Sequence, residues 1–307
     1  MASATAAYSQ DTRLGKGDWS NWRGPLQTGE SLESYEGYAF NTEPVWTDAI
    51  ASQGAPVIHN GRLYSWGYRG KGPDLVEVVQ AREESTGKVL WEQTTHDFMS
   101  DTVYDRYTVG SVTVDPETEN VIAATAHGIV TCYSKDGDIV WQISAMERFG
   151  RLTFPNARAG APAIDGDLVI IHAVTSYWGA DGPAKDRFLA FDKRTGELVW
   201  SSTPGVGAPF LKDSSFSTPL FETRQGKRVF YAGTGCGNVV CVNAKDGTPL
   251  WRFQLAVGGV NASLALAGDT VYAIHATENI DTPETGRAVG IRIPADLDKT
   301  GGTVDPE

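Results

Sequence analysis

The chain has 307 residues, of which 41% are hydrophobic and 21% charged, a composition typical of a folded globular protein. Its formal net charge of −12 argues against a nucleic-acid-binding protein, which needs clustered Lys and Arg, and against binding to an anionic membrane surface. No apolar run is long enough for a membrane span, and three cysteines cannot form a disulfide framework. The 34 Gly, 15 Pro and nine Trp favour an all-β protein.

Residues 1–43 form an N-terminal extension ahead of the repeats described below. Met1–Gln10 is small and polar, without the basic and apolar regions of a signal peptide. The sequence leaves open both a cytoplasmic protein and a chain whose signal peptide has been removed. Asp18–Ser31 follows, with the sequence DWSNWRGPLQTGES.

A turn followed by a Trp recurs four times along the chain. The segments REESTGKVLW, YSKDGDIVW, FDKRTGELVW and VNAKDGTPLW end at Trp91, Trp141, Trp200 and Trp251. Each contains a Thr-Gly or Asp-Gly pair whose glycine suits a tight hairpin turn with positive φ; these are Gly87, Gly137, Gly196 and Gly247. A fifth closing strand without its turn is expected at Glu43–Trp46.

Alternating strands are predicted upstream of each turn. Segments such as 55–64, 160–170 and 262–272 have the pattern of two strands joined by a polar tip, and a third strand follows. Each unit is therefore expected to hold four antiparallel strands, A to D. Units of this size and kind are blades of a β-propeller, in which the Trp would lie between neighbouring blades. We expect full units at 49–91, 92–141, 142–200 and 201–251, and a fifth at 252–293 without its Trp strand.

The units resemble the PQQ-like (pyrroloquinoline quinone) repeat, with its small residue, its Thr-Gly turn and its closing Trp. The resemblance covers residues 44–294, leaving a C-terminal tail at 295–307. Residues 18–31 also resemble the N-terminal stretch of exported bacterial members, and the outer-membrane assembly lipoprotein (BamB-like) is one such relative. The resemblance thus implies a periplasmic or extracellular protein.

The family closes its ring with seven or eight blades, so the resemblance implies a partial ring here. We expect an open arc of about five blades belonging to a larger propeller, and not a small ring closed by Glu43–Trp46. On that basis, removing residues 1–47 is expected to change the thermal stability only modestly.

The lengths of the predicted loops indicate which face carries the function. The D–A and B–C connections, which emerge on one face of a propeller, are longer than the A–B and C–D turns, and long loops on a rigid scaffold commonly carry binding residues. Mixed charge and one aromatic residue on these loops suggest a ligand or partner surface. The candidate residues are Asp101, Asp105, Arg106, Arg148, Arg151, Arg158, Trp178, Asp181, Lys185, Asp186 and Arg187.

The residues that a quinone-dependent dehydrogenase would need are not evident. Such an enzyme would carry adjacent cysteines, whereas Cys132, Cys236 and Cys241 are separate. Cys132 and Cys241 fall at positions that suit a small buried residue, and Cys236 is expected to be more exposed in a turn. The Asp-Gly pairs lack calcium-loop spacing, and the five His are dispersed, so we expect no catalytic, cofactor-binding or metal-binding residues.

Two functional hypotheses follow. The first is a non-catalytic propeller scaffold that binds a protein partner or small ligand through its D–A/B–C face. The alternative is a quinoprotein-type dehydrogenase, or another propeller enzyme, whose catalytic residues are missing from this chain. The identity of the partner or ligand is left open.

Overall fold

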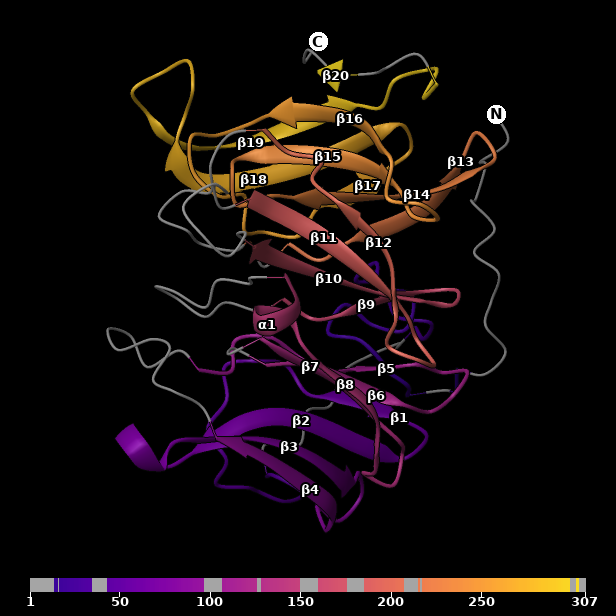
Figure 1. Ribbon diagram of the computed structural model, residues 1–307, viewed down its shortest axis with the longest axis vertical. Helices are drawn as coiled ribbons and strands as arrows, with labels where there is room; N and C mark the ends of the chain where they lie inside the picture. The colour runs from indigo at the N-terminus through magenta and orange to yellow at the C-terminus, as the bar shows by residue number, and fades with distance from the viewer. Residues whose placement is uncertain are drawn as a thin grey trace.

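Five β-sheets form the part of the molecule that the structure describes. The computed structural model describes residues 14–15, 17–34, 43–96, 107–125, 128–149, 160–175, 185–206, 215, 217–298 and 302–303. Within these ranges the sheets are stacked along the longest axis, from β1–β4 at one end to β17–β19 at the other (Figure 1). The all-β propeller architecture predicted from the repeats is confirmed as a partial ring.

The strands follow the predicted A-to-D order. The first four sheets have the orders β1-β2-β3-β4, β5-β6-β7-β8, β9-β10-β11-β12 and β13-β14-β15-β16, and we number these blades one to four. In them every strand is antiparallel to its neighbours in chain order. The fifth blade has three strands, β17-β18-β19, and the short β20 pairs in parallel with β16.

The elements that the structure defines are β1 (Val57–His59), β2 (Arg62–Arg69), the short 3-10 helix η1 (Gly72–Asp74), β3 (Val76–Glu83), β4 (Val89–His96), β5 (Thr113–Val114), β6 (Val121–Ala124), β7 (Ile129–Tyr133), β8 (Ile139–Ser144), α1 (Ala145–Phe149), β9 (Ala163–Asp165), β10 (Leu168–Thr175), β11 (Lys185–Asp192), β12 (Leu198–Ser202), β13 (Leu220–Arg224), β14 (Lys227–Gly233), β15 (Asn238–Asn243), β16 (Pro249–Gln254), β17 (Ala265–Ala267), β18 (Thr270–Glu278), β19 (Thr285–Arg292) and β20 (Gly302–Thr303). A search of the described residues for a helix with the length and apolarity of a membrane span finds none.

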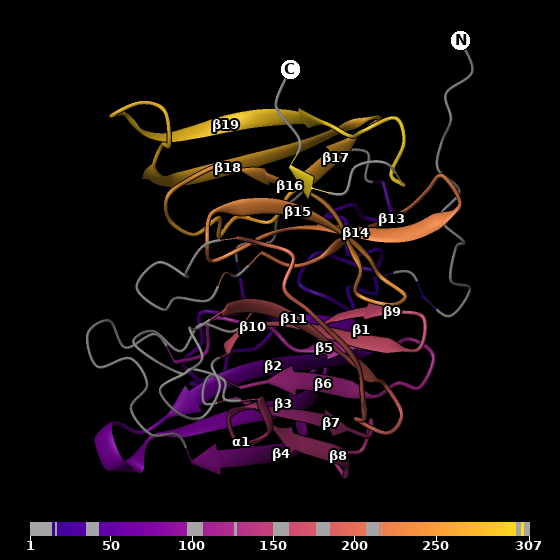
Figure 2. The ribbon, with the colours of Figure 1, turned by 45° about the horizontal axis from the view of Figure 1, so that its top comes forward.

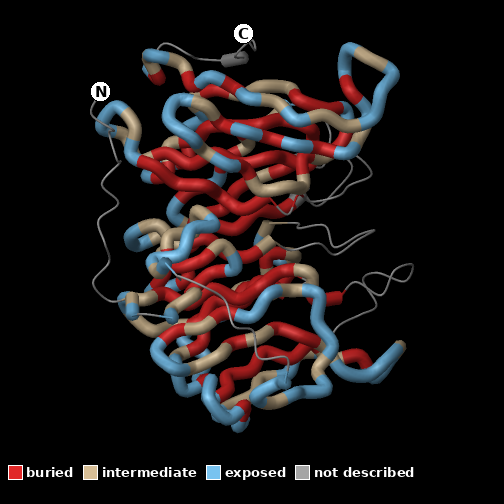
Figure 3. The backbone as a smooth tube through the Cα atoms, turned by 180° about the vertical axis from the view of Figure 1, so that it is seen from behind, coloured by how far each residue is buried: buried red, intermediate tan, exposed pale blue. Residues whose placement is uncertain are grey.

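The hydrophobic core is divided among the interfaces between blades. One cluster of buried residues lies between each pair of neighbouring blades. Buried residues are found in every blade of the stack (Figure 3). Between the third and fourth blades, for example, Ile170 and Phe188 pack with Phe230 and Val240. Neighbouring blades therefore bury the apolar faces that they turn toward each other, as the repeat pattern predicted.

A Trp at the end of one blade packs on the turn glycine of the next. A Cβ atom added to Gly137 would lie 2.8 Å from the ring of Trp91, and one added to Gly196 would lie 2.8 Å from the ring of Trp141. Trp46 faces Gly87 and Trp200 faces Gly247 in the same way. All four glycines have positive φ, between 71° and 93°. The repeat thus joins the first four blades in succession.

A hydrogen bond accompanies each of these contacts. The indole Nε1 donates to a backbone carbonyl in the turn of the next blade, at 2.8 to 3.2 Å. The acceptors for Trp46, Trp91, Trp141 and Trp200 are the carbonyls of Glu84, Lys135, Lys193 and Ala244. The predicted position between blades is therefore confirmed for Trp91, Trp141 and Trp200, whereas Trp46 makes the same kind of contact from outside the first blade. The contact is both apolar and directional.

The segment that contains Trp46 is not a closing strand of the fifth blade. Residues 43–50 form no strand, and instead of pairing near β19 they lie against the first blade, where Trp46 contacts Gly87 and Asp48 pairs with Arg82 at 2.5 Å. Ala51 then forms a bridge with Tyr68. The first and fifth blades lie at opposite ends of the stack (Figure 2), so the arrangement is an open arc, as expected.

The N-terminal extension contributes a strap, which we define as residues 18–27. It contacts the first strand of three successive blades: Trp19 bridges Ile58, the Ser20 carbonyl accepts a bond from the Val114 amide at 2.8 Å, and Gln27 exchanges two hydrogen bonds with Ile164.

The strap also reaches the fourth blade. Trp22 donates from Nε1 to Thr218 Oγ1 at 2.8 Å, just before β13 begins. The side chain of Asn21, which is almost fully buried, donates to Thr113 Oγ1 and to the Pro162 carbonyl. Because these bonds join four blades, the expectation that residues 1–47 matter little for stability is no longer supported.

The contact between Trp and glycine predicts that replacing two glycines, both with positive φ, lowers the free energy of unfolding by different amounts. Gly166 and Gly196 both have positive φ, but a Cβ atom at Gly166 would meet nothing within 4 Å. Gly166→Ala should cost roughly 1–2 kcal/mol through backbone strain alone. Gly196→Ala should cost about 1–3 kcal/mol more because the Trp141 ring must move. The free energies of unfolding from urea denaturation measure both, and equal losses would contradict the proposed contact.

Candidate functional site

The predicted loop residues are only partly within the described chain. Asp101, Asp105, Arg106, Arg151, Arg158, Trp178 and Asp181 lie outside the described residues. The other four are Arg148, Lys185, Asp186 and Arg187. Arg148 lies on α1, where its guanidinium pairs with Glu197 at 3.2 Å and lies over the ring of Phe149.

The other three described residues are in a strand, contrary to the prediction that placed them in a B–C loop. Lys185, Asp186 and Arg187 begin β11 because β10 and β11 pair through to Thr175 and Lys185. The pairing of β10 with β11 continues past the apolar residues and includes these charged ones. The predicted end of the B–C loop, which was placed after Arg187, was therefore wrong.

Asp186 is the functional candidate that the structure places most clearly. Its side chain is 1% exposed and contacts the Nε2 atom of His172 on β10. Its second oxygen accepts a hydrogen bond of 2.6 Å from the backbone amide of Gly235 in the fourth blade. The ring of His172 stacks on Phe188 at 4.2 Å between centroids. Asp186 therefore orients a buried histidine and also joins the third blade to the fourth.

The Nδ1 side of the His172 ring, opposite Asp186, is enclosed by the protein. Nδ1 is buried and has no hydrogen-bond partner among the described residues. His172 lines a cavity of about 10 Å³ together with Thr125, Gly128 and Gly160. That volume corresponds to about one water molecule, which a ring nitrogen can bind. The arrangement can hold one small polar molecule, and it is too small for an organic substrate.

Cys236 lies next to this cluster and is buried, so its predicted exposure is wrong. It is 4% exposed, because Gly205 packs closely against its Sγ and Thr234 Oγ1 approaches the same atom at 3.3 Å. Burial, assisted by the charge of Asp186, raises the pKa of its thiol. Cys132 and Cys241 are fully buried, as predicted, and burial raises the pKa of Cys132 to about 12.

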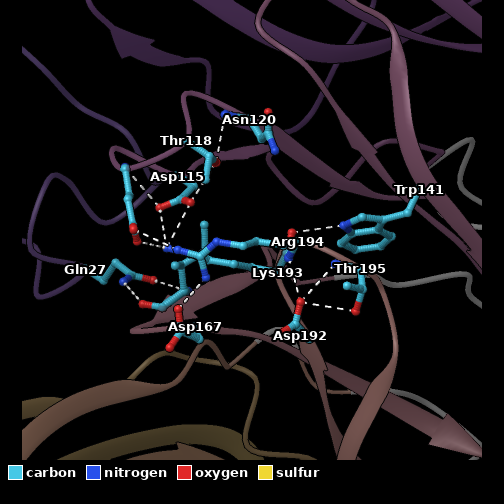
Figure 4. Close-up of polar contacts among 12 residues, drawn as sticks. Gln27, Asp115, Thr118, Asn120, Trp141, Asp167, Asp192, Lys193, Arg194 and Thr195 are labelled. Carbon is cyan, nitrogen blue, oxygen red and sulfur yellow. Dashed lines mark hydrogen bonds and ion pairs between the residues drawn. The ribbon is translucent and has the colours of Figure 1, made fainter.

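A second polar cluster lies on the opposite face, where the A–B and C–D turns emerge (Figure 4). Lys193, in the turn that follows β11, is buried, and its Nζ lies 3.0 Å from Asp115 and 2.6 Å from Glu117 of the second blade. The neighbouring Arg194 pairs with Glu117 at 2.7 Å and with Asp167 at 2.5 Å. The cluster forms because the A–B tip of one blade meets the C–D turn of the next.

The same turn also receives the inter-blade Trp. The Lys193 carbonyl accepts the bond from Trp141, while its ammonium group neutralises the buried carboxylate of Asp115. A buried ammonium paired with carboxylates has a structural role here, since a free buried charge would be costly.

A pocket of about 590 Å³ opens on this face between the first two blades. Its lining includes Asp18, His59, Asn60, Glu117 and Glu119. Asp18 pairs with His59 at 3.2 Å. Hydrogen bonds from Lys135 and Asn60 hold the pKa of Glu119 below its usual value, so this carboxylate stays charged. The pocket is large enough for a small ligand and is acidic.

Several of these residues were missed by sequence reasoning. His172, Lys193 and Asp115 have no local motif, and the ion pair between Lys193 and Asp115 spans 78 positions. The only signal was the repeat itself, which places A–B tips beside C–D turns. Within the described ranges, no group of three or more His, Cys, Asp or Glu side chains is placed to hold a metal ion.

The buried ion pair predicts that substitutions at two adjacent residues, Lys193 and Arg194, lower the stability of the protein by different amounts. Lys193→Met should destabilise the protein by about 3–5 kcal/mol because it leaves Asp115 buried without its partner. Arg194→Met is the matched control, since that side chain is 47% exposed, and should cost less than about 1 kcal/mol. Chemical denaturation of both variants measures the difference. A small loss at Lys193 would show that the cluster is solvated.

The burial of the thiols predicts low reactivity. A thiol reagent at pH 8 should label none of the three cysteines at an appreciable rate, because the thiolate is the reactive form and burial raises all three pKa values. Three equivalents should react after unfolding in guanidinium. Rapid reaction of one equivalent in the native protein, mapped to Cys236 by mass spectrometry, would contradict this placement.

Comparisons with known proteins agree with the fold. Residues 184–288 match a family model described as outer membrane protein assembly factor BamB. The search of curated proteins finds no match. A solved structure of quinohemoprotein alcohol dehydrogenase from Comamonas testosteroni is 15% identical with a TM-score of 0.56, covering 95% of this chain and 52% of that one. This chain therefore spans about half the length of that structure.

Two further structures show a lower similarity. A quinohemoprotein alcohol dehydrogenase from Pseudomonas putida HK5 is 17% identical, with a TM-score of 0.46 and coverage of 79% of this chain and 39% of that one. A europium-containing methanol dehydrogenase is 11% identical, with a TM-score of 0.47 and coverage of 92% and 74%. Residues 184–288 are therefore similar to a PQQ-like repeat family, and the described chain has the architecture of a partial β-propeller.

Proposed function

We propose that this protein is a non-catalytic β-propeller scaffold that binds a protein partner or a small ligand through the face formed by its D–A and B–C connections. The observation that carries the proposal is that the buried polar side chains bind other groups of the protein. Asp186 contacts His172 and accepts a hydrogen bond from the Gly235 amide. Lys193 forms ion pairs with carboxylates of the second blade.

A catalytic site needs groups that are available to a substrate. In the described chain the candidate acid, base and nucleophile are enclosed: His172 and Asp186 are each at least 90% buried, and Cys236 is 4% exposed. The adjoining cavity of about 10 Å³ leaves space for about one water molecule. These groups stabilise the assembly of blades, which is what a rigid binding scaffold requires.

The family match supports a role in protein binding and an exported location. The matching family model is described as an outer membrane protein assembly factor. We therefore place this protein in the periplasm or outside the cell and assign it a protein partner before a small ligand. The D–A/B–C face is favoured because Arg148 and Arg187 lie at its described border, with α1 and β11 as rigid supports.

The alternative is a quinoprotein-type dehydrogenase. The fold similarity to a quinohemoprotein alcohol dehydrogenase favours it only at the level of architecture, because the identity is 15%. This chain spans 52% of that structure, and under this alternative the catalytic residues would be missing from this chain.

Adding pyrroloquinoline quinone with Ca²⁺ distinguishes the two functions. A ligand at 100 times its Kd stabilises a protein by about 2.7 kcal/mol, so the melting temperature is a sensitive readout. For the scaffold we expect no change in the quinone absorbance and no shift in melting temperature. Ca²⁺ alone and quinone alone are the controls. Stoichiometric uptake of the quinone with a raised melting temperature would overturn the proposal in favour of the enzyme.

A further inference from the structure

The pocket on the face of the A–B and C–D turns lies between two neighbouring blades, inside the arc and not at either of its ends. Its volume is about 590 Å³, and its walls come mainly from three separate parts of the chain. These are Gly17 and Asp18 of the N-terminal extension, the A–B tip of the first blade at 58–61 and the A–B tip of the second blade at 116–119. A cavity of this volume lies in the range that binds small organic molecules.

The pocket is lined by negative charge. Lys and Arg do not occur among the described residues of its lining, whereas the acidic residues are Asp18, Glu84, Glu117 and Glu119. Glu117 is already paired with Lys193, and Glu84 is exposed in the turn after β3. A cleft lined by one sign of charge concentrates ions of the opposite sign. The pocket is therefore suited to a cation.

Two of the carboxylates are held in place by the protein itself. Asp18, whose side chain is 6% exposed, accepts hydrogen bonds from the backbone amides of Asn60 at 2.8 Å and Gly15 at 2.6 Å. Glu119 accepts a hydrogen bond from the Asn60 side chain at 3.0 Å and pairs with Lys135 at 3.0 Å. Groups that are already fixed lose little freedom when a ligand binds, which favours affinity.

A buried histidine adds unused hydrogen-bonding capacity to the same pocket. His59 belongs to the lining, and its side chain is 4% exposed. Its Nδ1 lies 3.2 Å from a carboxylate oxygen of Asp18 but forms no hydrogen bond among the described residues. A polar atom enclosed without a hydrogen bond is costly unless water or a ligand supplies one. His59 is therefore a second indication of a polar ligand, besides the carboxylates.

The placement of the carboxylates selects the kind of cation. A compact divalent ion needs several oxygen ligands that converge on one point. Within the described ranges, no group of three or more acidic, His or Cys side chains is placed in that way. A flexible chain with several ammonium groups can instead meet the carboxylates one at a time, while its methylene groups lie along apolar surface. Ile58 and Pro116 provide such surface in the lining.

We propose that this pocket binds an aliphatic polyamine, whose ammonium groups pair with Asp18, Glu84 and Glu119. Its methylene groups pack on Ile58 and Pro116. The pocket is on the face opposite the D–A/B–C connections, so this inference goes beyond the scaffold function and does not rest on it.

Isothermal titration calorimetry of the full chain with spermidine tests the proposal. We expect one saturable site, and raising the salt from about 20 mM to about 200 mM should weaken binding because ion pairs near the surface are screened. Glu84→Gln and Glu119→Gln should each raise the Kd at least about threefold, since each removes one ion pair. Circular dichroism checks that both variants fold, and Glu84→Gln changes an exposed side chain.

Two controls separate the pocket from a general attraction of polyamines to a chain with a net charge of −12. Glu147→Gln removes the same charge from an exposed residue of α1, on the other face, and should leave the Kd unchanged. Mg²⁺ in place of spermidine should give no saturable binding. Four results would overturn the proposal: spermidine does not bind, both pocket variants bind it as the wild type does, Glu147→Gln weakens binding as much as they do, or Mg²⁺ binds as tightly.

Discussion

The contact between a Trp of one blade and the turn glycine of the next is the interaction on which the fold depends. The glycine supplies a turn with positive φ and also the absence of a side chain, which lets the indole ring approach the backbone. The indole N–H then fixes the ring by donating to a carbonyl of the same turn. One short motif therefore specifies both the hairpin inside a blade and the docking of its neighbour.

Trp251, the last of the repeated Trp residues, shows how the contact changes when the next blade has no Thr-Gly or Asp-Gly turn of this kind. Trp251 is almost fully buried among residues of the fourth and fifth blades, with Ile293 and Leu297 in the same cluster, yet its Nε1 has no partner in the described chain. The four earlier Trp residues each find a turn carbonyl. At the interface between the fourth and fifth blades the Trp is therefore still buried although the hydrogen bond is missing, which indicates that apolar packing alone can hold this contact.

The fold was predictable from the sequence because its determinants are local and repeated. Gly87 and Trp91 are four residues apart, and the same spacing recurs in the next three units, so one observation predicts how the first four blades dock. The site was predictable only in part. Asp186 was recognised as a candidate, but its partner His172 lies on another strand, and the alternation that buries Asp186 continues through charged residues. Asn21 carries no local sign that it will bond to Thr113 and Pro162.

The strap has a consequence for the order in which the protein can be completed. Trp22 bonds to Thr218, 196 positions later in the chain, and Asn21 bonds to Pro162, 141 positions later. During synthesis the strap emerges before these partners, which lie directly ahead of the first strands of the third and fourth blades. The blades can form from local contacts, whereas the strap can only close across them afterwards. A segment that is made before the blades is therefore among the last to reach its native position.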